Sequence, residues 1–298
     1  MTIQRITIVG LGLIGGSLAL ALRRAGFTGE LVGCDRAEVL ATAIGREMVG
    51  RGSSDPVAAA LGSDVVVLAT PVGSIIDLIE RLGPVVRATT LLTDVGSTKR
   101  EIAERAQQVF GGAAGTRFLP SHPMAGGEHA GLDHAHTDLF RGAPWVFTLI
   151  NGQPEANSAA AEWIHLVEDM GAMPVFLDAA RHDRLCAWTS HLPQLISTAL
   201  ASAIAAEFGD DEAVRQISGR GLQDMTRLAA SGYSLWRDIV ATNSKNLDDV
   251  LLKYEQHLSH LRENLRGPAL REEFEAANRF RRELMNSPQR HRDTEGKE

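Results

Sequence analysis

Three glycines and one carboxylate give the clearest chemical signal in this sequence. The run Gly10-Leu-Gly-Leu-Ile-Gly15 follows an apolar stretch, and Asp35 lies about 20 residues further on. In such a pattern the first glycine allows a tight turn, the second lets the backbone approach a pyrophosphate, and the third lets a helix pack against a strand. The carboxylate would accept hydrogen bonds from ribose hydroxyls. The spacing therefore predicts a dinucleotide site with its phosphates at a helix N-terminus.

The same region indicates which dinucleotide is bound. A carboxylate at Asp35 would repel a 2′-phosphate, which favours NAD over NADP, although Arg36 beside it could partly compensate. The alternative for Asp35 is a solvated turn residue at a strand end. Further cofactor contacts are expected at the start of the helix and at the carboxyl end of the strand 64–70, from Leu13, Ile14, Thr70 and Pro71.

These residues need a sheet to position them. Strand patterns lie at 6–9, 30–34, 64–70, 91–95 and 118–121, and helical patterns lie between them at 17–22, 38–46, 73–82 and from 96 onward. Alternation of this kind predicts a Rossmann-type, doubly wound parallel sheet. A loop at 122–129, a strand at 144–149, a helix at 157–170 and a strand at 174–177 would complete a dinucleotide-binding domain of residues 1–176.

The remaining chain reads as helical. Apolar residues recur at spacings of three and four from residue 178, Pro193 should kink the first helix, and further helices are expected at 211–217, 222–230, 236–242 and 246–265. We therefore expect an all-helical substrate and dimerisation domain at 177–286 and a disordered tail at 287–298. The highly charged end that begins at Arg281 also has the composition of a disordered tail. The alanine-rich segment 199–206 and the apolar stripe 247–265 predict a homodimer.

Composition limits the partners and the compartment. The chain has 298 residues, 44% of them hydrophobic, and a net charge of −7, which argues against nucleic acid and anionic membranes. Cys34 and Cys186 lie in separate apolar segments, as reduced core thiols of a cytoplasmic protein would. No targeting segment or membrane span is expected, because the first strand starts near Ile3 and no apolar run is long enough.

Six motifs, in order, resemble those of the prephenate dehydrogenase family, which includes arogenate and cyclohexadienyl dehydrogenases. They are Gly10-Leu-Gly-Leu-Ile-Gly-Gly-Ser17, Asp94-Val-Gly-Ser97 with Lys99, Ser121-His-Pro-Met-Ala-Gly-Gly-Glu128, Ser190-His-Leu-Pro193, Asp224-Met-Thr-Arg227 and Trp236-Arg-Asp-Ile239. The resemblance covers about residues 3 to 285. It implies NAD-dependent oxidative decarboxylation of prephenate to 4-hydroxyphenylpyruvate in tyrosine biosynthesis. Arogenate, or both substrates, is the alternative that the motifs leave open.

The resemblance also implies roles for five residues. His122 and Ser97 match the catalytic positions that hydrogen-bond the ring hydroxyl, and the histidine would take the proton of that hydroxyl. His191 and Arg227 match substrate-pocket positions, with the arginine pairing with a carboxylate, and Glu128 matches an acidic residue at the pocket entrance.

Each role has a structural alternative. His122 could be a loop histidine that bonds the backbone, and Ser97 a helix N-cap. His191 could be a core histidine satisfied by a carbonyl freed at the Pro193 kink, and Arg227 could pair with Asp224 across one helical turn.

Two further arginines, Arg237 and Arg220, could also contact an anion. Arg237 is expected to pair with a carboxylate such as Asp238 or Asp224, although it could contact an anion. Arg220 stands where the family more often has a small residue, and could reach the site of a partner subunit.

Other functional classes remain to be weighed. The spacing Asp133-His134-Ala-His136 fits no common zinc pattern, so no metal is expected. A β-hydroxyacid or 6-phosphogluconate-type dehydrogenase would need a lysine on the first helix after the nucleotide domain, and the segment 178–200 contains none. A non-catalytic NAD sensor is the other alternative.

Overall fold

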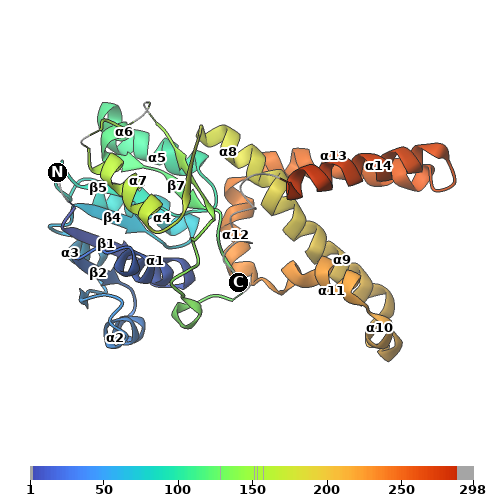
Figure 1. The fold of residues 1–298 in the computed structure, drawn as a ribbon, viewed down its shortest axis with the longest axis horizontal. Helices are drawn as coiled ribbons and strands as arrows, with labels where there is room; N and C mark the ends of the chain where they lie inside the picture. Colours follow the sequence, from blue (N-terminus) through green and yellow to red (C-terminus); the bar gives the residue numbers. More distant parts are fainter. Residues whose placement is uncertain (1–2, 128, 151, 153, 157, 287–298) are drawn as a thin grey trace. The chain divides into compact units, whose positions relative to one another are not determined.

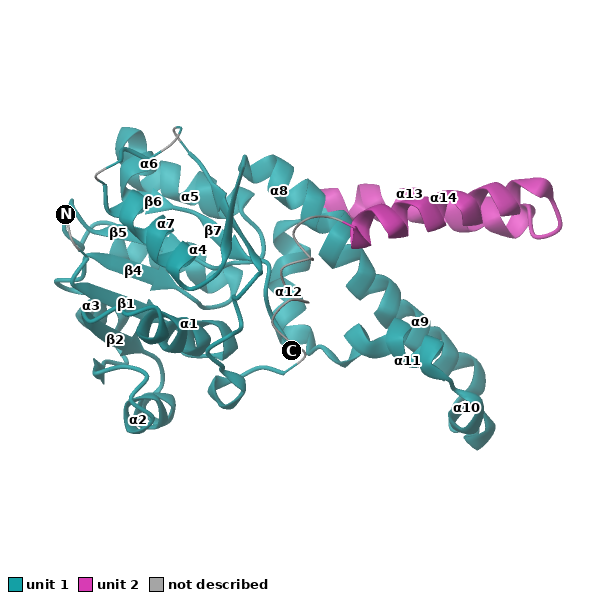
Figure 2. Cartoon of the chain, viewed as in Figure 1, with its two compact units in different colours: residues 1–244 teal, residues 245–298 magenta. Residues whose placement is uncertain are grey.

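The computed structural model of the protein describes residues 3–127, 129–150, 152, 154–156 and 158–286. The chain forms two compact units, residues 1–244 and 245–298 (Figure 2). The first unit contains every strand of the described chain and α1 to α12, and the second contains most of α13 together with α14. The domain limits at 176 and 286 rest on sequence pattern and stay predictions.

A parallel sheet of six strands forms the centre of the first unit (Figure 1). Its order β3-β2-β1-β4-β5-β6 places β1 beside β4, so the chain winds outward in both directions from this pair. Ligands of such sheets bind at the carboxyl ends of the strands where the winding reverses. The strands are β1 (Arg5–Val9), β2 (Glu30–Cys34), β3 (Arg51–Gly52), β4 (Val65–Leu68), β5 (Leu91–Asp94) and β6 (Phe118–Leu119).

Both faces of this sheet are buried. In β4, Val65 and Val67 join the core that contains Leu18 of α1, whereas Val66 and Leu68 join the core that contains α4 and α5. Because successive side chains point to opposite faces, a strand covered on both sides must be apolar throughout, and the doubly wound prediction is confirmed. The helices that follow these strands are α1 (Leu13–Arg24), α2 (Ala37–Gly45), α3 (Pro56–Ala60), α4 (Val72–Leu82), α5 (Arg100–Phe110) and the short α6 (Ala114–Arg117).

A second, smaller sheet follows the first. It contains β7 (Ser121–Pro123), β8 (Pro144–Thr148) and β9 (Met173–Leu177), with β7 antiparallel and β9 parallel to β8. Trp145 of β8 and Trp163 of α7 (Ala159–Asp169) are fully buried in the core that also contains Leu18 of α1. The expectation of a loop from 122 onward is wrong for its first two residues, because His122 and Pro123 pair with β8.

The chain after β9 is helical, as expected. Pro193 is the second residue of α9, and a π-helical turn at Ala187–His191 separates α9 from α8. A proline cannot donate a backbone hydrogen bond and crowds the carbonyl of the preceding turn, which a wider turn accommodates. The helices here are α8 (Ala179–Cys186), α9 (Leu192–Phe208), α10 (Glu212–Ile217), α11 (Arg220–Thr226), α12 (Tyr233–Thr242) and α13 (Ser244–Glu263).

The carboxyl-terminal end differs from its prediction. Helix α14 runs over Pro268–Met285, so the charged residues from Arg281 to Met285 are helical rather than part of a tail. Ion pairs between residues one helical turn apart, such as Arg271 with Glu275, stabilise this helix. The predicted tail at 287–298 lies outside the described residues. None of the helices in the described chain has the length and apolar character needed to cross a bilayer.

Candidate active site

The three glycines of the first motif meet different geometric demands. Gly10 has a φ of +97°, and a Cβ there would lie 2.5 Å from the Ala69 oxygen. A Cβ at Gly15 would lie 1.8 Å from the Gly10 oxygen, so the turn and the start of α1 can approach only without side chains. Gly12 precedes α1 and faces open space. This space, at a helix N-terminus, suits a phosphate group.

The other predicted cofactor residues lie at the same sheet edge. Asp35 ends β2, and its carboxylate accepts hydrogen bonds from the Leu11 nitrogen and the Arg36 nitrogen, each at 2.7 Å. A cavity of about 340 Å³ is lined by Gly10, Asp35, Arg36 and Thr70 among others. The Thr70 hydroxyl is buried without a hydrogen-bond partner among the described residues, as expected for a group that awaits a ligand. Leu13 and Ile14 open α1, and Pro71 directly precedes α4.

Four of the five predicted substrate and catalytic residues line one pocket. This pocket has a volume of about 610 Å³, and its walls include Ser97, His122, His191 and Arg227. They come from the loop after β5, from β7, from the π-helical turn and from the start of a 3₁₀ helix at Arg227–Ala230. Glu128, the fifth, lies outside the described residues. Folding thus gathers residues that are up to 130 positions apart in the chain.

His122 has the environment of a proton acceptor. Its Nδ1 lies 2.9 Å from Nε2 of His182, and no hydrogen bond to its own Nε2 is found among the described residues. Burial, together with the neighbouring His182 and Lys99, lowers the pKa of His122 well below its usual range. The imidazole is therefore neutral near pH 7, with one nitrogen able to accept a proton.

His191 is arranged as a donor. Asn243 Nδ2 lies 3.1 Å from its Nδ1, which must then accept, so Nε2 carries the proton. That Nε2 is buried with no partner within the described structure, and so is Trp236 Nε1, on a ring packed edge-on against His191 at 5.8 Å. Burial lowers the pKa of His191 to about 4. The alternative of a backbone carbonyl partner is wrong, because the partner is a side-chain amide.

Ser97 and Arg227 also occupy defined places. Ser97 lies two residues before Lys99, which directly precedes α5, so the N-cap alternative is wrong. No hydrogen bond from Ser97 to His122 is found in the described part of the chain. The segment after Arg227 is held on α9, because Gln194 donates to the Leu228 oxygen at 2.7 Å and the Ala229 nitrogen donates to Ser197 at 3.0 Å.

Arg237 forms the ion pair that the sequence suggested. Its Nε lies 2.9 Å from Asp238 Oδ1, while the guanidinium remains largely exposed. Arg220, the other arginine considered, begins α11 and does not line the pocket.

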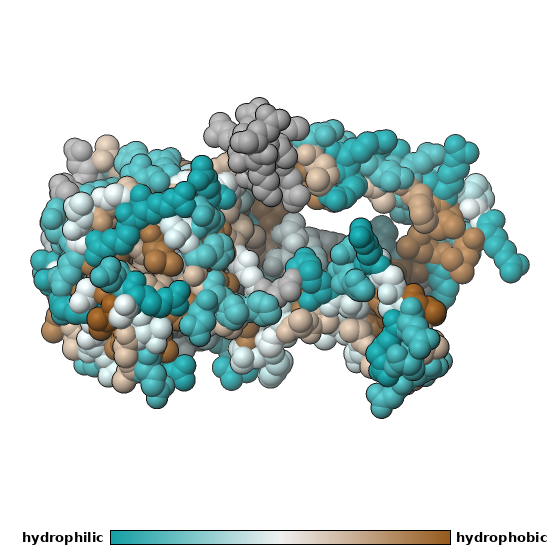
Figure 3. Space-filling view, turned by 60° about the horizontal axis from the view of Figure 1, so that its bottom comes forward, coloured by the Kyte–Doolittle hydropathy of each residue, from teal (hydrophilic) through white to brown (hydrophobic). Residues whose placement is uncertain are grey.

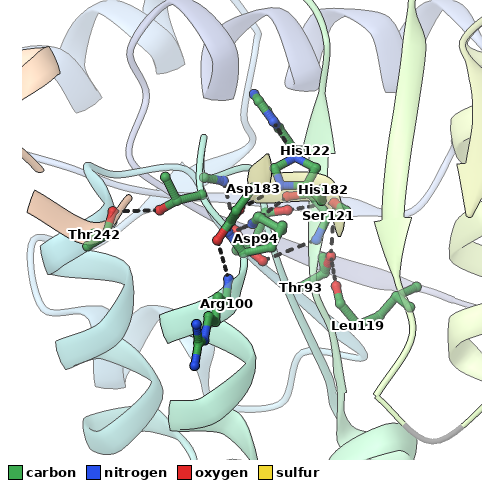
Figure 4. Close-up of polar contacts among 12 residues, drawn as sticks. Thr93, Asp94, Arg100, Leu119, Ser121, His122, His182, Asp183 and Thr242 are labelled. Carbon is green, nitrogen blue, oxygen red and sulfur yellow. Dashed lines mark hydrogen bonds and ion pairs between the residues drawn. The ribbon is translucent and has the colours of Figure 1, made fainter. Parts of the chain in front are cut away.

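A buried polar network adjoins His122 (Figure 4), and the sequence interpretation gave no role to its members. Lys99 and Asp94 are fully buried and form an ion pair, and Lys99 Nζ also donates to the Ser121 oxygen at 2.7 Å. His182 and Asp183 of α8 complete the network. A signal for them was present, since an adjacent histidine and aspartate on an otherwise amphipathic helix must find polar partners if they are buried.

The group of described residues whose atoms could hold a metal ion does not include Asp133, His134 or His136, for which the sequence raised that question. Among the described residues, the atoms that could hold an ion are those of His122, His182 and Cys186, which lie within 4.8 Å of one another. Burial raises the pKa of Cys186 to about 12, which disfavours the thiolate that a metal requires. The expectation that no metal is bound stays a prediction.

Comparison with known proteins tests the fold and the motif pattern together. The model described as "Prephenate dehydrogenase, nucleotide-binding domain" matches residues 18–175, and the one described as "Prephenate dehydrogenase, dimerization domain" matches residues 178–284. The chain belongs to the prephenate dehydrogenase family. It is therefore an oxidoreductase that uses a nicotinamide dinucleotide. Membership of this family decides against the 6-phosphogluconate-type and sensor alternatives.

Relatives within the family differ in their named substrates. A prephenate dehydrogenase from Lactococcus lactis is 29% identical over 259 residues, which cover 87% of this chain and 70% of that protein. The structure of Synechocystis arogenate dehydrogenase is 32% identical with a TM-score of 0.77, over 94% of this chain and 99% of that one. The structure of prephenate dehydrogenase from A. aeolicus with hydroxyphenyl propionate and NAD+ is 26% identical with a TM-score of 0.80, over 95% and 96%.

Proposed function

We propose that this protein oxidises and decarboxylates prephenate with NAD, forming 4-hydroxyphenylpyruvate for tyrosine biosynthesis. The observation that carries the proposal is the pocket in which a neutral His122 with an open Nε2 lies with His191 and Arg227. A base, a neutral donor and a cation are the groups required by a substrate with one hydroxyl and two carboxylates. Arogenate is the alternative substrate, because an alanyl side chain would meet the same three groups.

NAD fits the residues at the carboxyl edge of the sheet. Gly10, Gly12 and Gly15 would admit the pyrophosphate, and the Asp35 carboxylate would accept hydrogen bonds from the adenosine ribose. NAD, when bound, accepts the hydride that leaves the ring carbon bearing the hydroxyl. The negative charge of Asp35, which would repel a 2′-phosphate, favours NAD over NADP, although Arg36 and Arg81 also line this cavity.

The side chains of the pocket then perform proton transfer and orientation. His122 Nε2 would take the proton of the ring hydroxyl as the carbonyl forms, and release of CO2 makes the ring aromatic. Ser97 would bond the same hydroxyl. The His191 Nε2 and Trp236 Nε1 protons would meet substrate oxygens, which removes the cost of about 1–3 kcal/mol of leaving each buried donor unpaired.

One assay tests the proposal. The protein is mixed with prephenate or arogenate and with NAD or NADP, and NADH or NADPH absorbance and CO2 release are recorded for the four combinations. The highest kcat/KM is expected for prephenate with NAD. A higher value for arogenate would assign the alternative substrate, and no reduction of either dinucleotide would reject the proposal.

Replacing Arg227 with alanine should mainly weaken substrate binding. A charge-assisted bond to a carboxylate contributes about 1.5–3 kcal/mol, so KM for the substrate should rise by roughly ten- to a hundredfold while NAD affinity stays near the parent value. Lysine should restore binding only in part, because an ammonium cannot reproduce the two-pronged guanidinium contact. The control is Arg237→Ala, whose guanidinium is paired with Asp238. If Arg237→Ala raises KM and Arg227→Ala does not, the carboxylate binds at Arg237.

The protein should be a homodimer. Large apolar side chains stay exposed on the helices of both units, including Phe208 at 52%, Ile217 at 83% and Phe274 at 65%, and Figure 3 shows brown hydrophobic patches on the surface. Such surface favours association, and the matching family model is that of a dimerization domain. Light scattering should therefore return twice the chain mass of 32.1 kDa.

A matched pair of variants locates the dimer interface. Phe208→Glu places a charge at the end of the alanine-rich helix α9 and should weaken the dimer, whereas Leu61→Glu, at a similarly exposed position (54%) after α3, should not. A parent protein that is monomeric at micromolar concentration with full activity would overturn the prediction.

A further inference from the structure

Three side chains in a row lead away from the substrate pocket. His122 Nδ1 lies 2.9 Å from His182 Nε2, and His182 Nδ1 lies 2.8 Å from Asp183 Oδ1. His182 and Asp183 are each only 1% exposed, so water does not compete for these contacts. Figure 4 shows this row beneath His122.

The far end of the row is fixed. The Asp183 carboxylate accepts the Lys99 nitrogen at 2.7 Å and the Arg100 nitrogen at 2.9 Å, which are the first free backbone donors of α5. Both oxygens of the Asp183 carboxylate thus accept backbone hydrogen bonds, so this group offers only acceptors to its other neighbours.

The direction of every bond in the row follows from that acceptor. With one proton on its ring, His182 donates from Nδ1 to Asp183, so its Nε2 has a lone pair and accepts. His122 must then donate from Nδ1 to His182, which leaves the lone pair of His122 on Nε2. Nε2 is the nitrogen for which the described structure shows no partner, and His122 lines the pocket.

We propose that His182, anchored by Asp183, is a positioning residue that holds His122 in the tautomer able to accept the substrate proton. The inference rests on the proposed function, in which His122 is the base. Without His182 the neutral imidazole of His122 can place its proton on either nitrogen, and the form with Nε2–H cannot accept. Asp183 also helps to orient His191. Its backbone oxygen accepts Asn243 Nδ2 at 2.9 Å, and that amide donates to His191 Nδ1, so that in His191 the proton lies on Nε2.

Cys186 is the competing donor to His182. Its sulfur lies 3.4 Å from the same Nε2. A thiol is a weaker donor than an imidazole N–H, and the burial that raises its pKa to about 12 keeps it protonated. Cys186→Ala should therefore leave the tautomer of His122 unchanged.

The test compares two amide substitutions at one position. Asn places its amide near the His182 Nδ1 position, so His182→Asn keeps a contact to Asp183 and loses the acceptor for His122. Gln reaches the Nε2 position, so His182→Gln can supply an amide oxygen to His122. We expect kcat to fall by about 10- to 100-fold in His182→Asn with little change in substrate KM, and Gln to restore most of that loss. The control is His165→Asn, an exposed histidine on α7.

Nitrogen NMR of histidine-labelled protein gives a readout that does not depend on turnover. The signals of His122, assigned by their loss in His122→Asn, should show a protonated Nδ1 and an unprotonated Nε2 in the parent and in His182→Gln. They should show a mixture in His182→Asn. Equal kcat values in the Asn and Gln variants, or a protonated Nε2 in the parent, would overturn the proposal.

Different results would reject the proposed function and the proposed role of His182. If the parent reduces neither dinucleotide with prephenate or arogenate, the proposed function is wrong, while the parent spectrum still decides the tautomer. Thermal unfolding and NAD titration of each variant show whether a loss of kcat reflects a misfolded protein.

Discussion

Replacing His122 with asparagine should lower kcat by about 10²- to 10⁴-fold, the usual contribution of a general base. The structural reason is that His122 lines the pocket and has a pKa well below its usual range, so its imidazole is neutral at pH 7 and one nitrogen can accept the proton. Asparagine can still contact His182, but its amide does not accept a proton at this pH. KM should change far less than kcat, because the acceptor matters most as charge develops in the transition state.

Steady-state rates with NAD and the preferred substrate measure this effect. His165→Asn makes the same chemical change at an exposed position and should keep the parent kcat. A parent-like kcat in His122→Asn would remove this residue from the chemistry and leave it as a structural histidine of β7.

Replacing Lys99 with methionine should destabilise the protein by about 3–5 kcal/mol, the usual cost of removing one partner of a buried ion pair. The side chains of Lys99 and Asp94 have no exposed surface. Burial raises the pKa of Asp94 and lowers that of Lys99, and each group opposes the shift of the other. Without the ammonium, the Asp94 carboxylate still accepts hydrogen bonds from the Gly96 nitrogen at 2.7 Å and the Ser121 nitrogen at 3.2 Å, but no positive charge lies beside it. The Ser121 backbone oxygen also loses its hydrogen bond from Lys99.

The free energy of unfolding in urea measures the loss. Lys253→Met is the matched control, because Lys253 is 52% exposed and pairs with Asp249 one helical turn away, a contact worth less than about 0.5 kcal/mol. If Lys99→Met is as stable as Lys253→Met, the buried pair does not hold this part of the fold.

Local sequence pattern was sufficient for the parts of the fold that depend on local rules. Gly10 and Gly15 belong to one short motif and β4 to one apolar run, and the interpretation of both patterns agrees with the structure. Helix α5 shows the limit of this approach. It was expected from Gly96 but starts at Arg100, because carboxylates of Asp94 and Asp183 accept the backbone nitrogens of Gly96, Lys99 and Arg100.

The candidate site divides in the same way. Ser97, His122, His191 and Arg227 were found because their motifs resemble a family. His182 and Asp183 belong to no quoted motif, and their importance arises only when α8 brings them beside β7 and α5. A hydrogen bond between residues 84 positions apart, such as the one from the Lys99 backbone nitrogen to the Asp183 carboxylate, has no periodicity for a sequence interpretation to detect.

Helix α12, which carries Trp236, is bonded to the start of α4 and to the loop before α5. Asp238 accepts the Gly73 nitrogen at 3.1 Å at the start of α4, and Thr242 bonds the Thr98 hydroxyl at 2.8 Å before α5. Both segments follow the carboxyl ends of β4 and β5, the edge of the sheet at which the cofactor is predicted to bind. The two functional halves of the first unit are therefore not interchangeable modules. A chimera that joins residues 1–176 to the helices of a relative would keep a working pocket only if the grafted segment carried matching partners for Gly73 and Thr98.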